Sequence, residues 1–86
     1  MQRSWVVSAE YRILIDALAK VRRDRGISQR ELARRLSKPP SFINKIELLE
    51  RRLDILEFVV IAEAMGVPVA DLLTELRSKL PKTVSL

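Results

Sequence analysis

The sequence predicts an all-α fold in which five short helices enclose one small core. Apolar residues recur at intervals of three and four rather than in strict alternation, which indicates helices and not strands. Only two glycines occur, Gly26 and Gly66, and each lies where an apolar helical pattern stops. A chain of 86 residues has the length of one domain, so residues 1–86 are expected to form a single domain.

Helix start and stop signals divide this pattern into its elements. Ser8 is a suitable N-cap, while Ser28 and Asp54 each stand three residues before a glutamate, which is the spacing of a capping box. Proline favours the first position of a helix, so a third helix is expected to open at Pro39 or Pro40. The expected helices cover residues 8–25, 28–36, 39 or 40 onward, 54–65 and 69–79.

The helical part of the chain is expected to span residues 8–80, preceded by an N-terminal arm, 1–7, and followed by a loose tail, 81–86. Apolar side chains spaced at helical intervals form the candidate core. They are Tyr11, Leu14, Ile15, Leu18, Val21, Leu32, Ala33, Leu36, Ile43, Ile46, Ile55, Phe58, Ile61, Ala62, Met65, Leu72, Leu73, Leu76 and Leu80.

The composition argues against an enzyme and against a bound cofactor or metal. Neither cysteine nor histidine is present, which removes thiol chemistry, the commonest general base and the commonest transition-metal ligand. There is also no glycine-rich phosphate loop. No apolar run reaches the roughly 18 residues of a membrane span, and residues 1–10 do not have the pattern of a secretory signal, so a cytoplasmic protein without membrane contact is expected.

The basic residues are concentrated in the middle of the chain. The net charge is +5, yet the segment from Lys20 to Arg52 alone carries eleven basic and four acidic residues, a net charge of +7. A basic block beside a mildly acidic remainder favours a polyanionic partner on one face. The alternative is a solvated basic face with no partner.

The same segment carries a family resemblance that spans about residues 18–73. The sequences GISQRELARRL (26–36), SFINKIE (41–47), RR (51–52) and IAEAMGV (61–67) resemble the phage-repressor-like (Cro/XRE) helix-turn-helix family. The resemblance implies a five-helix, lambda-repressor-like DNA-binding domain. It also implies a sequence-specific, double-stranded DNA-binding transcriptional regulator, associated with the nucleoid, that inserts its third helix into the major groove.

The spacing of the third helix agrees with that role. Ser41, Asn44, Lys45 and Leu48 follow one another at i, i+3, i+4 and i+7, so they share a helix face. Asparagine reads adenine and lysine reads guanine in the major groove. The resemblance assigns Pro40, Ser41, Asn44 and Lys45 to the base-reading face. Alternatively, these side chains are ordinary surface, and Ser41 caps the helix.

Five further residues are expected beside the DNA backbone. The resemblance assigns Gln29, at the start of the second helix, to a phosphate and the neighbouring base contact. Arg51 and Arg52, in the loop after the third helix, are expected to clamp phosphates, and Lys38 and Arg30 are further phosphate candidates. The alternative for each is a solvated helix or loop residue.

The resemblance also implies a structural ion pair. The family counterpart of Glu47 lies under the first helix and pairs with a basic residue there, and Arg22 holds the matching position. A partly buried pair of this kind fixes geometry more than it adds stability. Arg34 and Arg35 are expected to be solvated.

Three sites depart from the family pattern. Pro39 and Pro40 replace the usual polar N-cap and first contact residue of the third helix. The turn between the second and third helices usually has a left-handed glycine where this chain has Ser37. If Ser37 keeps that conformation, strain of about 1 kcal/mol is expected. Leu48 and Leu49 replace the usual polar-glycine pair after the third helix. Without that glycine, the helix is expected to continue toward Glu50 or Arg52.

Apolar residues exceed what a five-helix core needs. They lie before the first helix, at positions that resemble solvent-facing ones in the family, and beyond the last expected core residue, which favours an interface. We therefore expect a homodimer, formed through the C-terminal helix as first choice or the N-terminal segment as second. Alternatively, Trp5 folds back onto the core. The surplus residues are Trp5, Val6, Val7, Leu48, Leu49, Leu56, Val60, Leu76, Leu80, Val84 and Leu86.

An alternative function is a protein-interaction module of the same fold, either an antitoxin or a helper subunit that contacts a second regulatory protein.

Overall fold

The computed structural model of the chain describes residues 8–86, and every regular element within that range is a helix. The all-α prediction is therefore confirmed, and the expected N-terminal arm lies outside the described residues. The helices are α1 (Ala9–Asp24), α2 (Gln29–Arg35), α3 (Ser41–Glu47), α4 (Ile55–Ala64) and α5 (Val69–Ser78).

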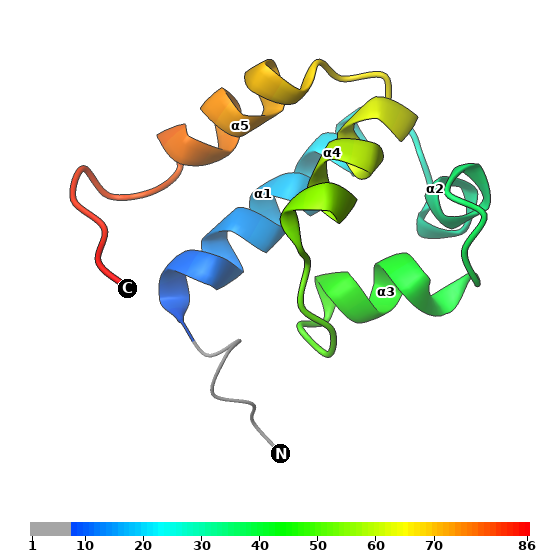
Figure 1. The fold of residues 1–86 in the computed structure, drawn as a ribbon, viewed down its shortest axis with the longest axis horizontal. Coiled ribbons are helices and arrows are strands. Elements are labelled where there is room, and N and C mark those ends of the chain that lie inside the picture. Colours follow the sequence, from blue (N-terminus) through cyan, green and yellow to red (C-terminus); the bar gives the residue numbers. More distant parts are fainter. Residues whose placement is uncertain (1–7) are drawn as a thin grey trace.

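The helices are arranged so that α2 and α3 form a pair on one side of the molecule. Figure 1 shows this pair opposite α5, with α1 and α4 between them. Helix α1 contacts both α3 and α5, while α4 contacts α2 and α5. Because α1 and α4 lie on the inner side of the pair, no helix of residues 8–86 packs against the outer face of α3.

Side-chain caps begin three of the helices. The hydroxyl of Ser8 accepts a hydrogen bond from the backbone N–H of Tyr11, and that of Ser28 accepts one from Glu31. The expected capping box is complete only at α4, where Asp54 and Glu57 bond each other's backbone N–H groups. At α2 the expected box is half formed, because arginines hold the Glu31 carboxylate.

Helices α1 to α4 all end in the same left-handed turn. The two glycines are there as expected, with φ of 70° at Gly26 and 76° at Gly66. Ser37 also has the left-handed conformation, with φ of 56°, which is the case in which the sequence predicts strain of about 1 kcal/mol. Leu49 also adopts it, with φ of 62°, so the expectation that α3 continues toward Glu50 or Arg52 is wrong.

The turn after α3 is stabilised by two features of Leu49 and its neighbour. The N–H of Leu49 bonds the Ile46 carbonyl, and the N–H of Glu50 bonds that of Lys45, which is the Schellman pattern. The Leu49 side chain is only 8% exposed and lies in the core. Burial of this side chain offsets a backbone strain of about 1–2 kcal/mol.

Most of the expected core residues are buried, but the structure corrects three positions. Ile55 and Leu73 were expected on the apolar faces of their helices and are instead 76% and 56% exposed. Leu49 was expected to be surplus and is instead buried in the core. Leu76, which the sequence placed both on the apolar stripe of its helix and among the surplus residues, is buried. The most deeply buried large side chains are Leu32, Ile46, Ile61 and Leu72.

The last residues continue from α5 without regular secondary structure. Residues 81–86 form no helix or strand, and the Arg77 guanidinium donates hydrogen bonds to the carbonyls of Pro81 and Lys82 at 3.0 and 3.1 Å. Over residues 8–86, no helix combines the length and apolar character needed to cross a bilayer.

Candidate nucleic-acid interface

Helix α3 separates an apolar face from a polar one. Ile43 and Ile46 are buried in the core, whereas Ser41 and Lys45 are exposed and Asn44 is half-buried. The helix begins at Ser41 rather than at a proline, since Pro40 is its N-cap. No side chain caps this end, so the alternative role of Ser41 as a cap is not seen.

Basic residues flank the polar face of α3 at its N-terminal end. An open groove there is lined by both Arg30, from the first turn of α2, and Lys38, from the turn between the helices. Pro40 lines the same groove, so the two cations lie beside the start of α3. Among residues 8–86, neither Arg30, Lys38 nor Lys45 forms an ion pair with an acid.

Glu47 joins α1, α2 and α3 beneath this face. Its carboxylate accepts hydrogen bonds from Nε of Arg22 at 2.8 Å and from Nη2 at 3.1 Å, so the pairing that the resemblance implies is present. Arg22 also donates to the Ile27 carbonyl at 2.7 Å. Gln29 donates its side-chain amide to the same carboxylate at 2.7 Å, so this sequence-predicted site residue is held against α3.

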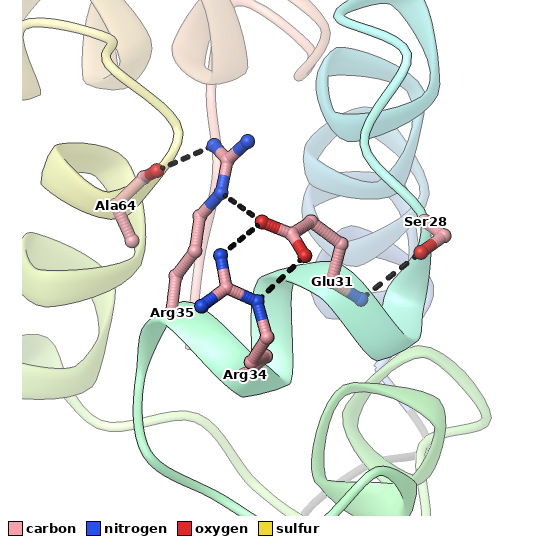
Figure 2. Close-up of polar contacts among 5 residues, drawn as sticks. All are labelled: Ser28, Glu31, Arg34, Arg35 and Ala64. Carbon is pink, nitrogen blue, oxygen red and sulfur yellow. Dashed lines mark hydrogen bonds and ion pairs between the residues drawn. The ribbon is translucent and has the colours of Figure 1, made fainter.

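The arginines at the end of α2 are held by a carboxylate of the same helix. Figure 2 shows Glu31 between Arg34 and Arg35, with both guanidinium groups turned toward it. Arg35 also reaches the carbonyl of Ala64 on α4 at 3.0 Å. Hydrogen bonds from Arg34 and then Arg35 lower the pKa of Glu31 to about 2. Both arginines are exposed, as expected, and their pairing with Glu31 lies on the surface of α2.

Arg51 and Arg52 follow α3 in the loop before α4, and they differ in surroundings. Arg52 is exposed. Arg51 donates through Nη1 to Oε1 of Glu57 at 2.9 Å and through Nη2 to the second oxygen at 2.5 Å. This pairing raises the pKa of Arg51 and lowers that of Glu57. The Arg51 guanidinium also lies 4.7 Å from the centre of the Phe42 ring.

The structure thus groups the nine sequence-predicted residues in three ways. Pro40, Ser41, Asn44 and Lys45 lie along the start and polar face of α3, with Arg30 and Lys38 beside them, while Arg52 is in the following loop and Gln29 and Arg51 are held by glutamates.

Sequence reasoning missed two partners in this arrangement. Phe42 was not assigned any role, and Glu57 was interpreted only as part of a capping box. The available signal was the charge of Glu57 six residues after Arg51, but that spacing crosses a loop and has no fixed geometry.

Comparisons with known proteins agree with this geometry. A family model described as "Helix-turn-helix" matches residues 18–72. The chain is similar to a solved "XRE-family like protein" from Pseudomonas syringae pv. tomato, with 42% identity, a TM-score of 0.76, and coverage of 85% of this chain and 89% of that one. It is also similar to the clp gene regulator ClgR from C. glutamicum, with 25% identity, a TM-score of 0.73, and coverage of 88% and 99%. No curated protein matches the chain.

Proposed function

The chain belongs to the XRE-type helix-turn-helix family of DNA-binding transcriptional regulators, and we propose that it reads a specific duplex by inserting α3 into the major groove. The observation that carries this proposal is the polar face of α3, where Ser41, Asn44 and Lys45 stand over buried isoleucines. A groove about 12 Å wide admits one helix. The inner side of α3 is fixed to the scaffold, so only its outer side is available to DNA.

Each residue of this face has a chemistry suited to bases. Asn44 offers a donor and an acceptor for an adenine edge, and Lys45 offers donors for a guanine edge. Ser41 is able to bond either kind of base edge, and Pro40 has no N–H to donate, so it contributes shape alone. This division assigns discrimination between sequences to Asn44 and Lys45.

The surrounding cations supply contacts to the backbone. We assign Arg30, Lys38 and Arg52 to phosphates, since these basic residues lie at either end of α3. Gln29, held by Glu47, retains its amide oxygen and the backbone N–H groups of the first turn of α2, which orient toward an anion. Binding is expected to weaken steeply with salt because each phosphate contact releases counterions.

We further propose that the protein acts as a homodimer through the α5 side. An apolar groove of about 280 Å³ runs between α1, α4 and α5, and the exposed side chains of Ile55 and Leu73 are part of its wall. A second copy that covers this groove also removes both side chains from water. To read a palindromic site, such a two-fold dimer has to present its two α3 helices about 34 Å apart, on successive turns of the duplex.

An alternative function within the same fold is an antitoxin or helper subunit that contacts a second regulatory protein. The exposed apolar side chains of Leu48, Leu56 and Val60 favour it, because they lie on α4 and the end of α3 rather than in the proposed dimer groove. In either case we propose a binding protein that works in the cytoplasm at the nucleoid, without an enzymatic activity or a cofactor.

Duplex selection followed by salt titration tests the proposed function. Wild type is used to enrich duplexes from a random-sequence library, and its affinity for the enriched duplex is compared with that for a shuffled one. Lys45→Ala is expected to lose about tenfold of this preference. Lys20→Ala is the matched control, since Lys20 is an exposed lysine on α1 paired with Asp24. A preference that Lys45→Ala leaves intact, or binding that is flat with salt, contradicts the proposal.

A further inference from the structure

We propose that Arg51 is a positioning residue that fixes α3 against α4, rather than a contact to a phosphate. The proposal rests on the proposed function, because its consequence is measured in DNA discrimination. It also revises the role that the sequence assigns to Arg51, which lies in a loop where a cation is expected to meet the DNA backbone.

The first observation is that both terminal nitrogens of the guanidinium are already engaged within the protein. Both terminal nitrogens of Arg51 donate to the carboxylate of Glu57 in a two-point pairing, and Nη1 also donates to the Arg52 carbonyl at 2.9 Å. Two-point arginine–carboxylate pairs are both strong and directional. A phosphate that took over the terminal nitrogens of Arg51 has to replace these bonds, so the pair with Glu57 is expected to persist in the complex.

The second observation is that the partner carboxylate belongs to the frame of α4. Oε1 of Glu57 accepts the backbone N–H of Asp54 at 3.0 Å, which closes the capping box at the start of that helix. The Glu57 side chain is only 20% exposed. Arg51 is therefore tied to a rigid helix end rather than to a mobile surface acid.

The third observation is that Arg51 also contacts an aromatic ring of α3, so the pair with Glu57 is linked to that helix. Phe42, the second residue of α3, is half-buried and packs on the core. Arg51 lies 4.7 Å from the centre of its ring, and Lys38, from the turn before α3, lies 5.4 Å from the same ring. Cations from the segments before and after α3 thus both contact the Phe42 ring.

The geometry has a direct consequence for recognition. Ser41 precedes Phe42, and Asn44 and Lys45 follow within one turn, so a rotation of the ring end of α3 re-aims all three side chains. Arg51 therefore controls which bases these side chains meet, although it touches none of them.

Three variants separate positioning from a phosphate contact. Glu57→Gln keeps the capping box, in which glutamine also serves, but removes the charge that holds Arg51. Arg51→Lys keeps the positive charge but loses the planar two-point pairing and the flat stacking on Phe42. Arg51→Gln removes the charge. Arg30→Gln serves as the comparison for a lost phosphate contact, and Arg23→Gln, an exposed arginine on α1, serves as the neutral control.

Binding of the enriched and shuffled duplexes is measured for each variant between about 50 and 200 mM salt, where phosphate contacts dominate. We expect all three variants to lose about tenfold of their preference for the enriched duplex, the loss expected from one misaimed base contact. The dependence of log affinity on log salt should stay unchanged for Arg51→Gln, whereas Arg30→Gln should reduce its slope by about 0.9. Hydrogen exchange of the α3 amides should accelerate in the same three variants and not in Arg23→Gln.

Several outcomes overturn the proposal. Arg51 is an ordinary phosphate contact if Arg51→Gln reduces the slope of log affinity against log salt while Arg51→Lys keeps the full preference for the enriched duplex. Tighter binding by Glu57→Gln shows that the acid merely competes with DNA for Arg51. If wild type prefers no duplex, the proposed function fails instead, and hydrogen exchange of α3 still reports whether Arg51 holds the helix.

Discussion

The carboxylate of Glu47 and the guanidinium of Arg22 form a two-point pair, at 2.8 and 3.1 Å, between α3 and α1. Both side chains are largely removed from water, with 16% and 9% of their surface exposed. The pair holds the inner side of α3 at its C-terminal end, while Phe42 is held at the other end. Helix α3 is therefore attached at both ends, which leaves its outer face for the proposed contact with DNA.

Removal of one member of this pair should destabilise the fold strongly. Arg22→Ala leaves a partly buried carboxylate with Gln29 alone and leaves the Ile27 carbonyl without its donor. We expect a loss of about 3 kcal/mol in the free energy of unfolding, measured by chemical denaturation. The double variant Arg22→Met, Glu47→Leu should recover most of this loss, because no charge is stranded. A double variant as unstable as the single one contradicts this account.

Substitution by glycine should change the stability of the protein differently at Ser37 and Leu49, the two non-glycine residues with a left-handed backbone. Ser37 is exposed, so Ser37→Gly removes strain and should stabilise the protein by about 1 kcal/mol. Leu49 is buried, so Leu49→Gly also removes about 2 kcal/mol of side-chain burial and should give no gain. Thermal unfolding of the two variants compares them directly. Equal stabilisation by both shows that Leu49 contributes nothing to the core.

These turns show how much of the fold follows from sequence. Helix spacing, glycine stops and capping residues predict the five helices closely. The end of α3 is not predicted, because leucine carries no left-handed preference and only its tertiary burial explains the turn. The polar face of α3 follows from i, i+3, i+4 spacing. The engagement of Arg51 by Glu57 does not, since it depends on how a loop folds back onto α4.

Stability should fall in acid because arginines hold the Glu31 carboxylate. The pKa of Glu31 is lowered from its ordinary value of 4.5 to about 2 in the folded chain. A lowered folded-state pKa gives stability that is fully present above the unfolded value and is lost as pH falls toward the folded one. Unfolding measured from pH 4.5 down to about 2 should therefore show this decline. Glu31→Gln should reduce this decline in stability more than Glu63→Gln, a control substitution of an exposed acid on α4. If both variants lose stability with falling pH to the same extent, Glu31 is excluded as the cause.

Disruption of the α5 groove should yield monomers. Leu73→Glu places a charge in the wall of the proposed dimer groove, where burial is costly. Sedimentation should then show a monomer, and affinity for the enriched palindrome should fall to that for a half-site. Leu56→Glu, at an exposed leucine outside that groove, is the matched control. If Leu56→Glu produces the monomer and Leu73→Glu does not, the interface lies on α4.

The position of DNA on the protein tests the central claim most directly. Backbone amide shifts of nitrogen-labelled protein are recorded by NMR while the enriched duplex is added. The account predicts that the largest changes fall on Ser41, Asn44 and Lys45, with changes at Arg30 and Lys38 that a shuffled duplex also produces. Changes confined to α4 and α5, with the α3 amides unmoved, contradict it.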